Sequence, residues 1–195
     1  NNLYRSGNSA DEFRLIQEVD NNEWIDYFEE PLFEELGLFG SIPDAPIGDF
    51  LEGSILHPAQ FGVAYLRNIL YLSDFNKFHV WPSEYTIEFA DEIKAIMLSG
   101  NTIIVFSGES VFGVSGGSPA SLSKYLLSNT APLLNKLSLS RIGNRVFYTS
   151  TDGLMMISSG GVVNLTKNHY TRNEWSDLNP STFYSKVADD SLFLE

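Results

Sequence analysis

Short runs of apolar, β-branched and aromatic residues alternate with polar turns along the chain, and the clearest example lies near its middle. Residues 102–106 form an apolar run, residues 107–110 contain the glycine and polar side chains of a turn, and residues 111–114 return with small residues interleaved. Two such runs joined by a short polar turn are typical of a β-hairpin. Because a lone hairpin is marginally stable in water, we expect further strands to pack against it.

The same pattern recurs along the sequence. A polar residue precedes a four- or five-residue apolar run at Asn68, Asn101, Asn144 and Asp190, and these starts are separated by 33, 43 and 46 residues. A four-stranded propeller blade spans roughly 40 to 50 residues. The repeat therefore predicts an all-β protein with a partial β-propeller of antiparallel blades. A β-sandwich is the alternative, and it should show turns every roughly 8 to 12 residues without the longer period.

The first third of the chain has a different pattern. Residues 3–6 and 13–19 predict a hairpin, and residues 24–26 predict a further strand. Residues 29–36 have the apolar spacing of a short helix, with Pro31 suited to its first turn. The glycines and prolines that follow indicate a linker. We therefore expect residues 1–50 to form an acidic N-terminal region, a sandwich-like hairpin plus linker, and residues 51–195 to form the propeller-like repeats.

Within the repeats, most strands can be placed from turns and apolar runs. Residues 91–98 fit a strand and a short helix about equally well, and the repeat favours the strand. Residues 116–124 predict a loop, and residues 126–139 an outer segment. Three further strands with two tight turns are expected at 146–150, 154–157 and 162–165. Residues 168–183 are a longer polar and aromatic excursion.

Composition supports a globular chain. Its 195 residues are 43% hydrophobic and 13% aromatic, with 15 glycines and 8 prolines that suit a turn-rich β fold. The sequence contains no run of about 18 apolar residues, so it predicts no membrane-spanning helix. Because the sequence does not begin with Met and an apolar run reaches its last residues, we expect a segment of a longer protein with an incomplete propeller.

Acidic residues are concentrated near the start. Residues 1–53 carry 13 acidic side chains and two arginines, whereas residues 54–195 carry 12 acidic and 10 basic ones. The net charge of −13 argues against a phosphate-binding surface, which needs clustered lysine and arginine, so no direct nucleic-acid binding is expected.

Catalytic and metal-binding patterns are weak. The chain has no cysteine, and His57, His79 and His169 are not at ligand spacing, so loop packing is the better interpretation and no metal or other cofactor is expected. Residues 150–153 partly match the Asp-box turn of sialidase-like propellers, which is itself structural. We therefore expect no enzyme activity and no catalytic residues.

Aromatic residues in the predicted loops are the best candidates for an interaction surface, because tyrosine, tryptophan and similar rings are favoured at contact hot spots. An alternative role, capping of the blade ends by the same rings, is about equally compatible with the sequence. The candidates are Phe75, Phe78, Trp81, Tyr170 and Trp175.

Five groups of residues together resemble a family of known proteins. They are residues 4–6, 71–74 with 79–82, 103–106 with 114–120, 150–154, and 172–175 with 178–181. In this order they resemble bacteriophage and prophage tail proteins in which a fibronectin type III-like sandwich precedes a β-propeller.

The resemblance implies a virion structural component, a hub, nozzle or fibre-attachment protein, that is made in the bacterial cytoplasm. Such a protein acts through contacts with other tail proteins and as a homo-oligomer. The alternatives are a carbohydrate-binding or sialidase-like propeller and a bacterial scaffold propeller unconnected with virions.

Overall fold

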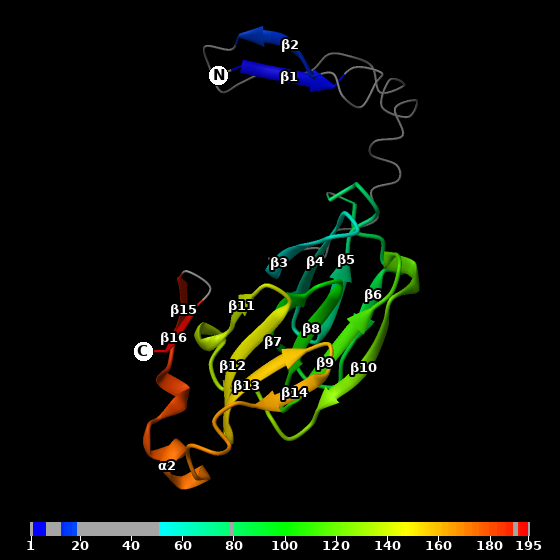
Figure 1. The fold of residues 1–195 in the computed structure, drawn as a ribbon. Coiled ribbons are helices and arrows are strands. Elements are labelled where there is room, and N and C mark those ends of the chain that lie inside the picture. Colours follow the sequence, from blue (N-terminus) through cyan, green and yellow to red (C-terminus); the bar gives the residue numbers. More distant parts are fainter. Residues whose placement is uncertain (1, 7–12, 19–50, 79, 189–190, 195) are drawn as a thin grey trace. The chain divides into compact units, whose positions relative to one another are not determined.

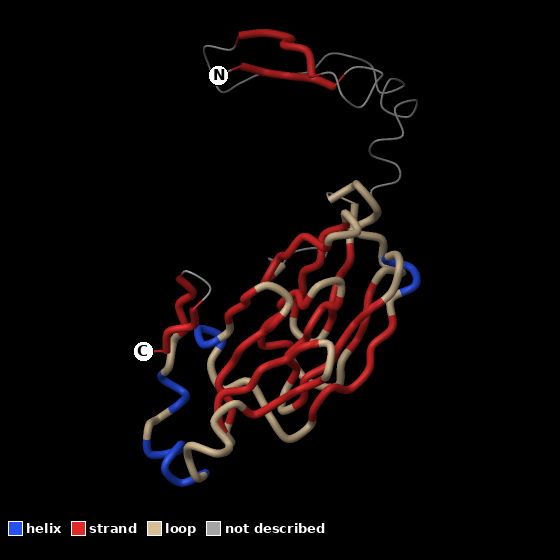
Figure 2. The backbone as a smooth tube through the Cα atoms, in the orientation of Figure 1, coloured by secondary structure: helices blue, strands red, loops and turns tan. Residues whose placement is uncertain are grey.

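Antiparallel strands are the main secondary structure of the described residues, with a few short helical turns between them (Figure 2). The computed structural model describes residues 2–6, 13–18, 51–78, 80–188 and 191–194. The chain divides into two units, Asn1–Ile42 and Pro43–Glu195, which are considered separately.

In the first unit, β1 (Asn2–Ser6) pairs with β2 (Phe13–Glu18) in an antiparallel hairpin. The register shifts between Leu3 and Tyr4, where a bulge interrupts the pairing. This confirms the predicted hairpin. The strand expected at 24–26, the helix at 29–36 and the boundary near residue 50 lie outside the described residues.

The second unit begins with a four-stranded antiparallel sheet, blade 1, shown in cyan to green in Figure 1. Its strands pair in chain order, which makes the sheet a simple meander. They are β3 (Glu52–His57), β4 (Phe61–Leu66), β5 (Ile69–Leu72) and β6 (Thr86–Glu88).

Blade 2 is a second meander that contains the central hairpin. Its strands are β7 (Ile93–Ser99), β8 (Thr102–Ser107), β9 (Ser110–Ser115) and β10 (Ser123–Ser128). The hairpin prediction is confirmed by β8 and β9, and β7 is the strand that the repeat favoured over a helix. The outer strand β10 starts inside the segment expected to be a loop, after the short 3₁₀ turn η1 (Pro119–Ser121).

Blade 3 follows the 3₁₀ turn η2 (Lys136–Ser138). It consists of β11 (Ser140–Ile142), β12 (Arg145–Ser150), β13 (Gly153–Ser158) and β14 (Gly161–Asn164). The last three strands were predicted, whereas β11 was not, because three residues are too short a run to stand out in the sequence.

The last elements are α2 (Arg172–Asp177), η3 (Pro180–Thr182) and a two-stranded sheet. This sheet consists of β15 (Ser185–Ala188) and β16 (Ser191–Leu194), paired antiparallel. It lies beside blade 3, where β15 contacts β11 (Figure 1).

The first strands of successive sheets lie next to one another, with β3 against β7, β7 against β11, and β11 against β15. The outer strands β10 and β14 also meet. Meanders arranged side by side with their first strands innermost are blades of a propeller. The described residues of the second unit therefore form three four-stranded blades and two strands of a further sheet, which confirms the predicted partial propeller.

The sequence repeat matched a third strand of blade 1 with the second strands of the later blades. Asn101 and Asn144 precede β8 and β12, the second strands of their blades, whereas Asn68 precedes β5, a third strand. The equivalent strand of blade 1 is β4. The short spacing of 33 residues in the sequence repeat arises from this mismatch.

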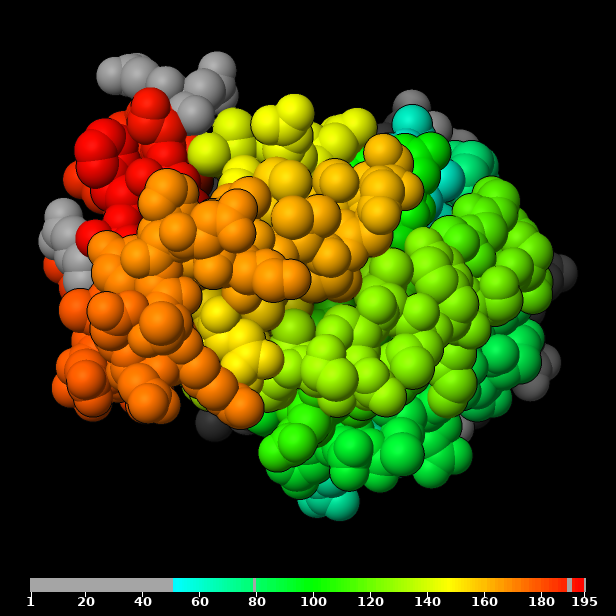
Figure 3. Space-filling view, turned by 60° about the horizontal axis from the view of Figure 1, so that its bottom comes forward, coloured from blue at the N-terminus to red at the C-terminus, as the bar shows by residue number. Residues whose placement is uncertain are grey.

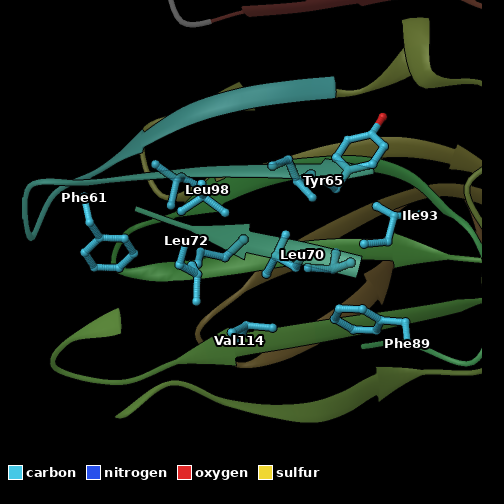
Figure 4. Close-up of a cluster of buried hydrophobic side chains, with 12 residues drawn as sticks. Phe61, Tyr65, Leu70, Leu72, Phe89, Ile93, Leu98 and Val114 are labelled. Atoms are coloured by element: carbon cyan, nitrogen blue, oxygen red, sulfur yellow. The ribbon is translucent and has the colours of Figure 1, made fainter. Parts of the chain in front are cut away.

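Two hydrophobic clusters hold the blades together, and β8 contributes to both. Ile103 and Val105 point into the cluster between blades 1 and 2, seen from the side in Figure 4, while Ile104 and Phe106 point into the cluster between blades 2 and 3. All four side chains are almost completely buried. Because successive side chains on a strand point to opposite faces, a continuous apolar run predicts a strand covered on both sides.

Hydrogen bonds also join the turns between the first and second strands of successive blades. His57 Nδ1 accepts a hydrogen bond from the Ala59 N–H at 3.1 Å, so Nε2 carries the proton and donates to Asn101 O at 2.9 Å. In the next blade the Ser99 hydroxyl donates to Asn144 O at 2.6 Å. His57, the last residue of β3, is buried and stacks on Phe61 with ring centroids 4.3 Å apart, so its ring is part of the packing of blade 1.

Candidate interaction surface

The five aromatic candidates occupy different environments. Phe75 and Phe78 in the loop between β5 and β6 are 53% and 48% exposed, and Tyr170 is 45% exposed. Trp81 is half-buried. Trp175 is only 3% exposed and belongs to the core. The structure therefore brings Phe75, Phe78 and Trp81 into one loop and places Tyr170 and Trp175 together elsewhere.

A tight turn presents Phe75 and Phe78. Asp74 accepts a hydrogen bond from the Phe75 N–H at 2.8 Å and forms an ion pair with Lys77 Nζ at 3.1 Å. These two contacts, the Lys77 bond first, hold the pKa of the Asp74 carboxyl below its usual value. The carboxylate is thus ionised at neutral pH, and its contacts are lost only as the pH falls through this lowered pKa.

The turn is also tied to the rest of blade 1. The Asn76 N–H donates to Gln60 O at 2.8 Å, which links the turn to the connection between β3 and β4. The Asp74 N–H donates to Val80 O at 2.8 Å and closes the base of the turn. Asn76 adopts a left-handed conformation with φ of 56°, which asparagine tolerates better than most residues. The two exposed phenyl rings therefore stand on a backbone fixed by several hydrogen bonds.

The Trp81 side chain, in the same loop, packs on the backbone of β4. A Cβ atom built on Gly62 would come within 3.2 Å of the Trp81 ring, so the indole lies directly over the backbone of β4. The Gly62 N–H donates to the Ser73 hydroxyl at 2.7 Å beside it. Trp81 is thus packed against its own blade, which matches the capping role that the sequence left open for the aromatic loop residues.

Trp175 fixes helix α2 to the end of blade 3. Its indole N–H donates to Ser150 O at 2.8 Å, and its ring meets Phe183 edge to face with centroids 5.8 Å apart. The helix starts with a capping box, in which the Thr171 side chain bonds the Glu174 N–H and the Glu174 carboxylate accepts from the Thr171 N–H. Hydrogen bonds from the Thr171 N–H and hydroxyl lower the pKa of Glu174. The Thr171-x-x-Glu174 pattern was a sequence signal for this helix that the prediction missed.

Groups of side chains that could hold a metal ion were sought among the described residues. Within the described ranges, no group of three or more histidine, cysteine, aspartate or glutamate side chains could hold a metal ion. The turn at 150–153 joins β12 to β13, and Asp152 forms an ion pair with Arg172 at 3.0 Å.

No helix in the described part of the chain is long and apolar enough to cross a bilayer.

The fold of this chain is similar to those of some solved protein structures. No family model matches the chain, and no curated protein sequence matches it. The crystal structure of BamB from Moraxella catarrhalis matches 75% of this chain and 47% of that chain, with 16% identity and a TM-score of 0.47. The structure of Hsv2 from Kluyvelomyces marxianus matches 74% of this chain and 48% of that one, with 12% identity and a TM-score of 0.43. The chain thus spans about half the length of these two structures. Its partial propeller fold is established separately, by the strand order described above.

Proposed function

We propose that the chain is a structural component of a phage tail, a hub, nozzle or fibre-attachment protein, that acts through protein–protein contacts and without catalysis. The observation that carries the contact role is the turn that exposes Phe75 and Phe78. The tail setting is supported by the sequence resemblance of segments along the whole chain. On this proposal the protein is made in the bacterial cytoplasm and resides in the virion.

The fixed backbone beneath the two phenyl rings favours binding. An interface residue contributes most when it buries a large apolar area and loses little conformational freedom on association. The Asp74–Lys77 ion pair and the hydrogen bond from Asn76 to Gln60 order this turn before a partner arrives. Phe75 and Phe78 therefore have the properties of hot-spot residues.

A second exposed apolar set lies on the fourth sheet and the segment before it, and it supports contact with further copies or with other tail proteins. Phe193 is 50% exposed, Tyr184 47% and Val187 39%. Because the net charge is −13, we expect these partners to be proteins and not nucleic acid.

The contact role is tested by replacing both phenylalanines. Phe75→Ser with Phe78→Ser should weaken association with co-expressed tail proteins by about thirtyfold or more, since hot-spot truncations cost about 2 kcal/mol or more. The thermal midpoint should stay within about 2 °C of the parent, because both rings are exposed. Association would be measured by quantitative co-purification.

Tyr170→Ser is the matched control, because Tyr170 is comparably exposed but lies on a different loop. It should leave association unchanged. Unchanged association in the double variant, or an equal loss in the control, would contradict a contact site at this turn.

The tail setting is tested by mass spectrometry of purified phage particles. The tryptic peptide from Val146 to Lys167 is flanked by Arg145 and ends at a lysine, so it should be recovered intact. We expect it at a few to a dozen copies per particle. Its presence in cells together with its absence from particles would overturn the tail proposal and favour the carbohydrate-binding alternative.

A further inference from the structure

A groove between blades 2 and 3 has the size and the lining of a small-molecule site. Its volume is about 490 Å³, within the range of roughly 300 to 1,000 Å³ typical of ligand pockets. One wall is formed by β10, and the other by the turns before β12 and between β13 and β14. Figure 3 shows the light-green surface around β10 next to the orange surface of blade 3.

A tyrosine ring forms the apolar wall of this groove. Tyr125 on β10 is paired with Gly113 on β9, and a Cβ atom on Gly113 would come within 2.5 Å of the Tyr125 ring. The glycine thus allows the ring to lie against the backbone of β9. The ring is still 44% exposed and lines the groove. This arrangement fixes an aromatic platform before any ligand binds.

The rest of the lining includes several polar residues and one positively charged side chain. Arg145 lines the groove and is exposed, and no described residue forms an ion pair with it. The groove lining contains no carboxylate among the described residues. The neighbouring Asn144 is held in place because its carbonyl accepts the hydrogen bond from Ser99. The groove therefore combines a guanidinium that no described residue pairs with and a positioned turn.

Hydroxyl and backbone groups complete the polar side. The β13–β14 hairpin contributes Ser158, Ser159 and two glycines at its turn, and a Cβ atom on Gly161 would meet nothing within 4 Å. A ligand can therefore approach the backbone of this turn closely. Serine hydroxyls both donate and accept hydrogen bonds, which suits a ligand rich in hydroxyl groups.

We propose that this groove binds a carboxylate-bearing saccharide, such as a uronic or sialic acid residue. The C–H face of a pyranose ring matches the negative face of Tyr125, its hydroxyl groups match the serines of the turn, and its carboxylate matches Arg145. An extended peptide fits less well. Tyr125 and Leu127, which both line the groove, are two residues apart and therefore lie on the same face of β10. The groove thus opens onto this face and not onto the backbone edge that an added peptide strand would need.

Binding is tested on the 195-residue chain by NMR titration with methyl glucuronide, methyl sialoside and the neutral methyl glucoside. At least one acidic saccharide should bind about tenfold more tightly than the glucoside, since a hydrogen bond between charged groups contributes about that factor. Arg145→Gln should remove this preference without changing the weak binding of the glucoside. Tyr125→Ala should weaken binding of both.

Two control variants test whether binding takes place in this groove. Arg141→Gln removes an exposed arginine of β11 that does not line the groove, and it should leave binding unchanged. If Tyr125→Ala disturbs the structure of β10, the contribution of the ring is tested by Tyr125→Phe instead. This variant keeps the ring and should retain most of the affinity. The proposal is overturned if no acidic saccharide binds, if Arg141→Gln has the same effect as Arg145→Gln, or if a glutamate-rich peptide binds the groove more tightly. None of these outcomes affects the turn at Phe75 and Phe78, so the site is independent of the proposed tail role.

Discussion

Trp175→Ala is expected to lower the free energy of unfolding by about 3 to 5 kcal/mol, the usual cost of truncating a buried tryptophan. The indole is 3% exposed, donates to Ser150 O at 2.8 Å and packs on Phe183. The variant therefore loses apolar burial and leaves a buried carbonyl without its partner. For a chain of this length, the thermal midpoint should fall by about 10 °C. Urea denaturation followed by circular dichroism measures the effect.

Two variants complete this experiment. Trp175→Phe keeps most of the packing and should lose only about 1 to 3 kcal/mol through the missing N–H donor. Tyr170→Ala removes the exposed neighbour whose ring centroid is 6.1 Å from that of Trp175, and it should cost less than about 1 kcal/mol. If Trp175→Ala leaves unfolding unchanged but weakens association with partners, the capping role is wrong and the contact role that the sequence left open is correct.

Phe106→Ala should have an effect of similar size at the interface between blades 2 and 3. Phe106 is 1% exposed and meets Tyr148 edge to face, with centroids 4.9 Å apart. The Tyr148 hydroxyl donates to Ala131 O at 3.0 Å, and burial raises the pKa of Tyr148 well above its usual value. Because this anchored ring cannot move far to fill the space, we expect a cavity and a loss of about 3 to 5 kcal/mol.

Denaturant titration again provides the measurement, and the midpoint should shift without a change in slope if unfolding stays two-state. Phe106→Leu fills much of the space and should cost about 1.5 kcal/mol. Phe193→Ala is the exposed counterpart, since Phe193 is 50% exposed, and it should change stability by about 0.5 kcal/mol or less. A cost for Phe106→Ala no larger than that of Phe193→Ala would show that the buried Phe106 ring does not stabilise the interface between blades 2 and 3.

The fold class could be predicted because apolar runs and turns repeat along the chain. The run at residues 102–106 is apolar on both faces of β8, and the structure covers both faces. The phase of the repeat was harder to predict. Polar turn residues precede second and third strands alike, so Asn68 before a third strand has the same local signature as Asn101 before a second strand. Only the pairing of strands distinguishes them.

The environment of each aromatic residue could not be predicted in the same way. Trp81 and Trp175 both lie in segments between the predicted strands, but their burial depends on neighbours that are distant in the chain, such as Gly62 for Trp81 and Ser150 for Trp175. The groove beside Tyr125 was missed for a related reason. It arises from Gly113, a residue without a side chain on an adjacent strand, together with Arg145 from the next blade.

The strand order has a consequence for synthesis of the protein. In each described blade, every strand pairs only with the strands immediately before and after it in the sequence. The ladder of one blade can therefore form as soon as its own fourth strand has left the ribosome exit tunnel, without waiting for later blades. Contacts of such short sequence separation favour fast folding, and folding that proceeds from the N-terminal side shortens the time for which apolar edges are open to aggregation.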